Sequence, residues 1–214
     1  MDKLETLKGL YASALSALSD ISASQDGISG PLFLSVPKDY ERTAVRLMIV
    51  GQQTYGWPSI TIGLDGLLSQ YREFDLGRGY TASPFWQASH RLFAALNPAG
   101  PERAFLWSDL VKVDQHNERP APDVEEQVSK LGLLLAELRL LKPDVVVFFT
   151  GPHYDDRLKK TFPGVEYREL TPDVAMLKHA DLPVKAYRTY HPRYLWQAKK
   201  RAALDAIVEN AGDA

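Results

Sequence analysis

The sequence predicts an α/β fold: a three-layer α/β/α sandwich around a central, mainly parallel sheet of four strands. Two observations lead to this prediction. Four short apolar runs have the length and composition of buried strands, and they occupy residues 46–51, 104–110, 144–151 and 184–191. Helical patterns separate these runs, and strands that alternate with helices are typical of a parallel sheet covered on both faces.

The first segment of the chain has helical spacing. Its apolar residues recur at Leu4, Leu7, Tyr11, Leu15 and Leu18, and acidic residues lie in its first turn. This is not the basic-then-apolar layout of a signal peptide. A turn-rich segment follows at 22–31. We therefore expect residues 1–30 to form an N-terminal helix and connector, and residues 31–214 to form the α/β part of a single compact domain.

Three more helices are predicted from apolar residues at helical spacing, at 84–96, 123–141 and 192–209. Pro143 ends the second of these helices. Residues 165–170 have the pattern of an additional minor strand.

The composition excludes several classes of protein. With 214 residues the chain suits one well-filled core, and it has no run of about 18 apolar residues that could span a membrane. Cysteine is absent, which excludes disulfides, thiolate nucleophiles and iron–sulfur clusters and favours a cytoplasmic location. The histidines lack metal-ligand spacing, and no nucleotide-binding glycine motif occurs. We expect a monomer without metal or cofactor.

The charge is unevenly distributed. The net charge of −2 gives no general basic field, but six basic residues and no acid lie between Lys185 and Arg201. Such a local cluster can hold phosphate groups. The alternative is an ordinary solvated helix face.

Each predicted strand is followed by polar residues. In an open parallel sheet, ligands bind beyond the carboxyl ends of the strands, where these groups would converge. The alternative is that loops are polar in any case. The residues concerned are Gln52 and Gln53, Ser108 and Asp109, Thr150 and Gly151, and His191 and Arg193. Amides read the edge of a nucleobase, aromatic rings stack on its face, and histidine can donate a proton to it.

Two motifs carry a resemblance to the uracil-DNA glycosylase superfamily. "GQQTYG" (51–56) resembles the family's first motif, usually Gly-Gln-Asp-Pro-Tyr-His, and "HPRYLW" (191–196) resembles its last, usually His-Pro-Ser-Pro-Leu-Ser. Between them, "FLWSDL" (105–110) and "VVVFFTG" (145–151) are similar to the family's intervening strands. The resemblance covers roughly residues 45–205 and implies a protein that hydrolyses the N-glycosidic bond of a base in DNA.

The resemblance also implies roles for individual residues. His191 would donate to the leaving base. Gln53 stands where the family has its water-activating aspartate, so Gln53 would orient the water through its side-chain carbonyl, or Asp109 would replace the missing carboxylate. Tyr55 would shape the floor of the pocket. The expected base-binding residues are Gln52, Tyr55, Ser108, Thr150 and Gly151, with Ser108 or Asp109 in the place of the family's base-reading asparagine.

The last motif and the basic cluster are expected to contact DNA, either duplex or single-stranded. Arg193, Lys199 and Lys200 would bind phosphates. Leu195 would either wedge into the duplex or lie in the core of the last helix. Two other functions stay open from the residues: a base-binding module that has lost catalysis, and a glycosidase that acts on a free nucleoside.

Overall fold

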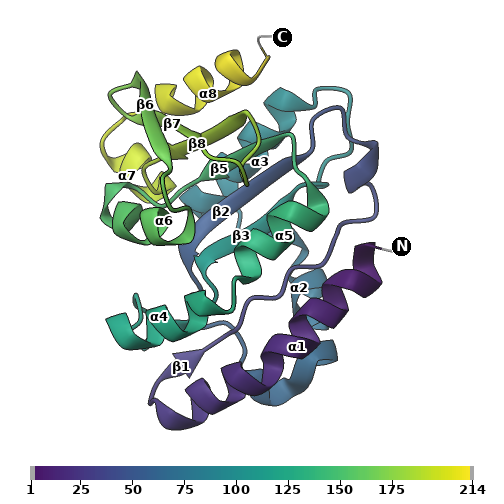
Figure 1. Ribbon diagram of the computed structural model, residues 1–214. Coiled ribbons are helices and arrows are strands. Elements are labelled where there is room, and N and C mark those ends of the chain that lie inside the picture. Colours follow the sequence, from purple (N-terminus) through teal and green to yellow (C-terminus); the bar gives the residue numbers. More distant parts are fainter. Residues whose placement is uncertain (1–2, 213–214) are drawn as a thin grey trace.

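The computed structural model describes residues 3–212, so the outermost residues of both predicted segments, 1–2 and 213–214, lie outside it. It has helices on both faces of a central, mainly parallel sheet (Figure 1), which confirms the predicted fold class. The four predicted strands are the four parallel strands of the sheet: β2 (Leu47–Gln53), β3 (Leu106–Val111), β5 (Val145–Phe148) and β8 (Lys185–Thr189).

The sheet has six strands rather than the predicted four, in the order β3-β2-β5-β8-β7-β6. The additional strands are β6 (Glu166–Thr171), which matches the predicted minor strand, and β7 (Val174–Lys178). They form an antiparallel hairpin that continues the sheet from β8. β6 has little apolar patterning because no residue of this edge strand is fully buried. A two-stranded ribbon, β1 (Ile28–Ser29) with β4 (Asp114–Gln115), lies outside the main sheet.

Eight α-helices lie within residues 3–212. They are α1 (Lys3–Ser24), α2 (Gly63–Phe74), α3 (Pro84–Leu96), α4 (Pro122–Lys130), α5 (Leu133–Leu141), α6 (Asp155–Thr161), α7 (Pro192–Gln197) and α8 (Ala202–Gly212). α1 packs against α4 and α5, whereas α3 packs against α7 and α8. Figure 1 shows α5 in front of the sheet and α3 behind it. None of these helices is long and apolar enough to cross a bilayer.

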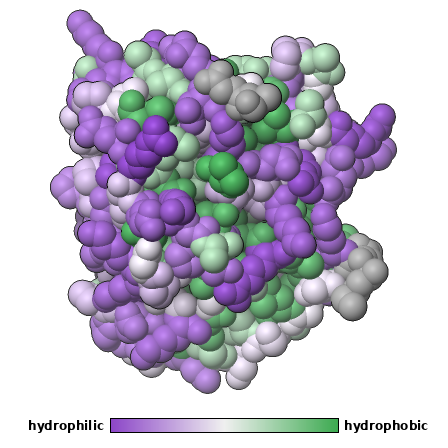
Figure 2. Space-filling view, turned by 45° about the horizontal axis from the view of Figure 1, so that its top comes forward, coloured by the Kyte–Doolittle hydropathy of each residue, from purple (hydrophilic) through white to green (hydrophobic). Residues whose placement is uncertain are grey.

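Short 3-10 helices complete the described chain: η1 (Tyr40–Arg42), η2 (Ile60–Ile62), η3 (Asp75–Gly77) and η4 (Pro152–Tyr154). The surface seen in Figure 2 is mainly polar, and apolar side chains show between the polar ones.

Two of the predicted helices are each divided in two. Gly132 has a φ of 63° between α4 and α5, a left-handed conformation that glycine adopts without steric cost. Lys199 has a φ of 56° between α7 and α8. The apolar spacing continues across both breaks, so periodicity alone did not reveal them.

Tyr71 covers part of the edge strand β3. Its hydroxyl accepts a hydrogen bond from the Trp107 backbone N–H at 3.0 Å and donates one to the Trp107 carbonyl at 2.9 Å. Its ring also stacks on the Trp107 indole, with 5.7 Å between ring centroids. Edge strands expose unpaired backbone groups that invite pairing with another chain. Tyr71 satisfies two of these groups on β3.

A buried ion pair joins the N-terminal helix to the sheet. Lys112, at the end of β3, lies 2.7 Å from Oε2 of Glu137 on α5, and neither side chain is more than 3% exposed. The Tyr11 hydroxyl on α1 donates to Oε1 of the same carboxylate at 2.7 Å. α1, β3 and α5 therefore share one buried polar network.

We expect Lys112→Met to lower the free energy of unfolding by about 3–5 kcal/mol, because it leaves the Glu137 carboxylate buried without its cation. Urea denaturation followed by circular dichroism measures this loss. The double variant Lys112→Met/Glu137→Leu removes both charges, and we expect it to recover most of the stability. A single variant as stable as the parent chain would contradict a dry ion pair at this position.

Candidate functional site

The carboxyl ends of the parallel strands meet where the strand order reverses. β2 lies between β3 and β5, so the chain passes from β2 to β3 on one side and then returns to β5 on the other. Ligands of open α/β sheets bind at such a point. Gln52 bridges it, because its side-chain amide donates to the Thr150 carbonyl at 2.8 Å. α6 and α7, which follow β5 and β8, mark this edge on the left of Figure 1.

Ser108 and Asp109 point to opposite faces of β3, as neighbouring residues of a strand do. Ser108 faces α5, is fully buried and donates to Oε2 of Glu137 at 2.7 Å. The expectation that Ser108 contacts a base is therefore wrong. Asp109 is in register with Gly51 of β2, and its side chain lies on the face of the sheet opposite to that of Ser108.

Asp109 is a buried carboxyl group with unused hydrogen-bonding capacity. Its side chain lies against Gly51, where an added Cβ would come within 2.2 Å of Oδ1, so only glycine fits. Its Oδ2 has no hydrogen-bond partner within residues 3–212. Burial raises the pKa of Asp109 to about 7, although the charge of Lys112 and the nearby indole N–H of Trp107 oppose the shift. Near neutral pH the group can thus present either an acid or a carboxylate.

Phe85 brings the first and last motifs together. One edge of its ring lies 3.5 Å from the Cβ position of Gly51, beside Asp109. The same ring stacks on the His191 imidazole, with 5.9 Å between centroids and 25° between planes. Being half-buried, it offers a flat apolar surface at this edge. The sequence predicts Phe85 only as a core position of a helix, and the one signal for more is its place in the first turn of α3.

His191 is held as a neutral hydrogen-bond donor. It caps the start of α7, and its Nδ1 accepts a hydrogen bond from the Arg193 backbone N–H at 3.2 Å. The proton of the neutral ring must then reside on Nε2. Burial, together with the charge of Arg193, lowers the pKa of His191 to about 4, so the ring is uncharged at neutral pH.

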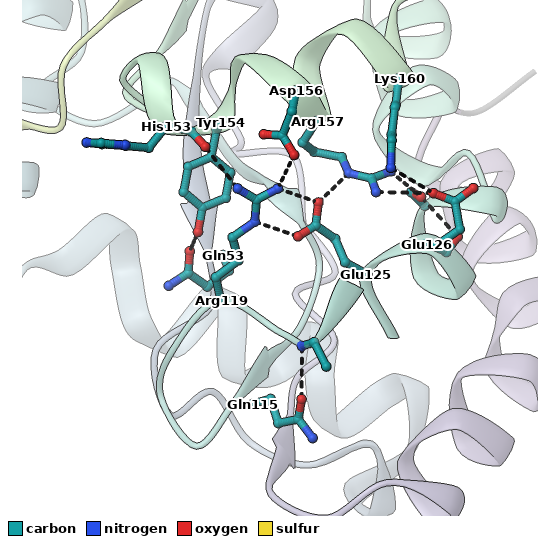
Figure 3. Close-up of polar contacts among 12 residues, drawn as sticks. Gln53, Gln115, Arg119, Glu125, Glu126, His153, Tyr154, Asp156, Arg157 and Lys160 are labelled. Atoms are coloured by element: carbon teal, nitrogen blue, oxygen red, sulfur yellow. Dashed lines mark hydrogen bonds and ion pairs between the residues drawn. The ribbon is translucent and has the colours of Figure 1, made fainter. Parts of the chain in front are cut away.

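The side-chain carbonyl of Gln53 already accepts one hydrogen bond from within the protein. Its Oε1 accepts a hydrogen bond from the Tyr154 hydroxyl, and Tyr154 belongs to η4, after β5 (Figure 3). One lone pair of this carbonyl is thus occupied, and the orientation of water by Gln53 stays a prediction; the amino group of the same side chain can only donate. Tyr154 carried no sequence motif that pointed to this contact.

Asp114 holds the loop of the first motif. Its carboxylate accepts hydrogen bonds from the Thr54 hydroxyl at 2.8 Å and from the Gly56 backbone N–H at 3.0 Å. With both neighbours fixed, and with Gly56 at a φ of 64°, Tyr55 projects outward and is 80% exposed. The expectation that Tyr55 forms a pocket floor is wrong in this structure.

Leu195 is expected either to wedge into the duplex or to lie in the core, and the exposed aromatic residue of this motif turns out to be its neighbour Tyr194. Leu195 is fully buried in the core, so its core alternative holds. Tyr194 beside it is 43% exposed and packs on Tyr190 at 4.6 Å. Apolar packing of α7 against α3 decides which residue turns inward.

The expected phosphate-binding cations differ in their surroundings. Arg193 and Lys199 are exposed. Lys200 is partly exposed and forms an ion pair with Asp173 at 2.6 Å. A phosphate would have to compete with Asp173 for it, and its role as a phosphate ligand stays a prediction.

The remaining expected residues lie at the end of β5. The Thr150 hydroxyl is buried and has no hydrogen-bond partner within the described chain. Gly151 has a φ of 68° and starts η4. Within residues 3–212 no three histidine, aspartate or glutamate side chains are grouped to hold a metal ion.

One of three comparisons with known proteins, a scan against family models, identifies the family of this chain. The model of the uracil DNA glycosylase superfamily matches residues 37–211, a range that includes Gly51, Phe85, Asp109 and His191. The crystal structure of wild-type Pedobacter heparinus SMUG2 matches with 13% identity over 94% of this chain and 95% of that chain, at a TM-score of 0.41. No curated protein sequence matches. The chain belongs to the uracil DNA glycosylase superfamily.

Proposed function

We propose that this protein is a DNA glycosylase that hydrolyses the N-glycosidic bond of a damaged or modified base turned out of DNA. Membership of the superfamily supports a glycosylase-like function. The observation that carries the proposal is the position of Phe85, which stacks on His191 and lies, like the Asp109 carboxyl, against Gly51. A flipped base needs a flat surface to stack on, polar groups for its edge and a donor for its departure.

His191 would supply the donor. Cleavage of the bond to deoxyribose gives the sugar oxocarbenium-like character and leaves negative charge on the base. The Nε2–H of a neutral imidazole can stabilise that charge without first being protonated by solvent. Removal of one such preorganised donor typically costs about 3–4 kcal/mol of barrier.

Asp109 would read the edge of the base. As a neutral acid it offers one donor and one acceptor side by side, which suits a base edge with a carbonyl next to an N–H, as in uracil. As a carboxylate it only accepts, which suits an exocyclic amine. Because the pKa of Asp109 is about 7, the protonation state selects between these two classes.

Two other functions are outcomes of the same assay. Incubation with labelled single- and double-stranded oligonucleotides that carry uracil-type and cytosine-type lesions, followed by alkaline cleavage, detects abasic sites. Salt-dependent binding without abasic sites would identify a binding module. Release of base from nucleosides but not from oligonucleotides would identify a nucleoside hydrolase.

With the preferred oligonucleotide, His191→Ala is expected to lower kcat by about 100- to 1000-fold, because it removes the donor to the leaving base. Single-turnover cleavage measures the effect, and the melting temperature checks that the variant is folded. Retention of full activity would exclude His191 as that donor.

The excision of a uracil-type base is expected to weaken as pH rises through about 7, because the neutral form of Asp109 then disappears. Asp109→Asn keeps one donor and one acceptor at every pH, so its profile across this range is expected to be flat. A parent profile that instead rises through pH 7 would mean that Asp109 acts as a base. In that case Asp109→Asn would be inactive throughout.

DNA binding is expected to weaken with salt, and Arg193→Ala should reduce the slope of log K against log salt by about 1. Lys200→Gln is the matched control, since Lys200 already forms an ion pair with Asp173. Fluorescence anisotropy over a salt series measures both slopes. Equal slopes for the parent and the Arg193 variant would remove Arg193 from the phosphate contacts.

A further inference from the structure

The orientation of the Gln53 carboxamide is set by a neighbour that the family motifs do not include. We propose that Tyr154 is a positioning residue that keeps the Gln53 amino group turned toward the site, so that Gln53 donates a hydrogen bond to the departing base. The inference rests on the proposed glycosylase function for its substrate. It assigns Gln53 a role opposite to that of a water-binding acceptor.

The first step is the contact between the two side chains. The Tyr154 hydroxyl donates to Oε1 of Gln53, which occupies the carbonyl end of the carboxamide (Figure 3). Tyr154 is only 5% exposed, so water competes poorly for its hydroxyl. This bond fixes which end of the carboxamide faces Tyr154; the oxygen keeps one lone pair, and the amino group at the other end can only donate.

The second step is the clamp on Tyr154. The guanidinium of Arg119 lies over the Tyr154 ring, 4.4 Å from its centroid, and donates to the backbone carbonyl of His153 at 2.9 Å. One side chain therefore holds both the ring and the backbone of η4. A planar guanidinium suits this double contact better than the point charge of a lysine does.

The third step is the anchoring of Arg119. It forms a two-pronged ion pair with Glu125, at 2.6 and 2.9 Å, and a further one with Asp156 at 2.8 Å. Arg157 contacts the same Glu125 carboxylate at 2.5 Å from the other side. Burial alone would raise the pKa of Glu125, but the hydrogen bonds from Arg119 and Arg157 outweigh it and lower the pKa. The clamp thus stays charged at neutral pH, and it ties α4 to α6 behind Tyr154 (Figure 3).

The Gln53 amino group suits the leaving base better than the attacking water. The bond from the anomeric carbon to the base nitrogen breaks, the electron pair leaves with the base, and the water oxygen forms the new bond. One water proton remains in the sugar hydroxyl, and the other goes to solvent or to the released base. An attacking water must give up one proton to an acceptor, which the amino group of Gln53 is not. The leaving base, in contrast, gains negative charge and benefits from a second donor beside His191.

Gln53→Glu separates the two roles of this residue. The introduced carboxylate can still accept from Tyr154 but cannot donate to the base. We expect kcat/KM at pH 7.5 to fall about 100-fold relative to the parent chain, and the deficit to shrink when both are compared at a pH low enough to protonate the new carboxyl. Activity equal to or above that of the parent would overturn the inference, because a carboxylate serves an activated water better than an amide does.

Tyr154→Phe tests the positioning. Loss of the hydroxyl frees the Gln53 carboxamide to rotate, and we expect kcat to fall about tenfold with KM nearly unchanged. In Gln53→Glu the donor is already lost, so adding Tyr154→Phe should cost little more. Tyr40→Phe is the matched control, since the Tyr40 hydroxyl is buried without a partner within residues 3–212. Full additivity of the two variants, or parent-like kcat in Tyr154→Phe, would overturn the inference.

A spectroscopic readout keeps this inference distinct from the proposed function. If the parent chain excises no base from any oligonucleotide, the proposed function fails on its own. The side-chain amide resonances of Gln53, identified in ¹⁵N-labelled protein by their absence in Gln53→Glu, then decide the orientation. We expect them to shift in Tyr154→Phe and to stay in place in Tyr40→Phe. Unchanged resonances in Tyr154→Phe would overturn the contact itself.

Discussion

The parallel pairing of β2 with β3 and β5 is the constraint on which the site depends. Parallel strands end at the same edge of a sheet, so the register that sets Gly51 beside Asp109 also brings Gln52 next to Thr150. Gly51 then has to be a glycine, because a side chain would occupy the space of the Asp109 carboxyl. The strand register thereby fixes the Asp109 carboxyl against Gly51 of the first motif.

The buried polar groups on the two faces of β3 differ in whether all of their atoms have hydrogen-bond partners. On the face toward α5, Ser108 and Lys112 both bond to Glu137, so the polar atoms have partners. On the face toward α3, Asp109 keeps an oxygen without a partner in the described chain. Buried polar groups in folded proteins are nearly always paired, and exceptions cluster at sites of function. The paired groups at Ser108 and Lys112 therefore belong to a structural network, whereas the unpaired oxygen of Asp109, one residue after Ser108, belongs to the candidate site.

Some of the cations near the strand-end edge are paired within the protein. Arg119 and Lys200 form ion pairs with Glu125 and Asp173, whereas Arg193 and Lys199 are exposed. This distribution fits the slightly negative net charge of −2. Any affinity for DNA would then depend on a few exposed cations and on the flat surfaces that the aromatic side chains at this edge offer to bases.

The sequence by itself determined the four parallel strands, the edge at which they end and the two motifs that identify the family, because these are encoded in local apolar runs and short residue patterns. Only the tertiary structure decided which polar residues serve the site. Strand alternation turned Ser108 inward and Asp109 to the site. Packing of α7 buried Leu195, and Asp114 turned Tyr55 outward. The Tyr154–Gln53 contact joins residues 101 positions apart, and no local pattern encodes such a pairing.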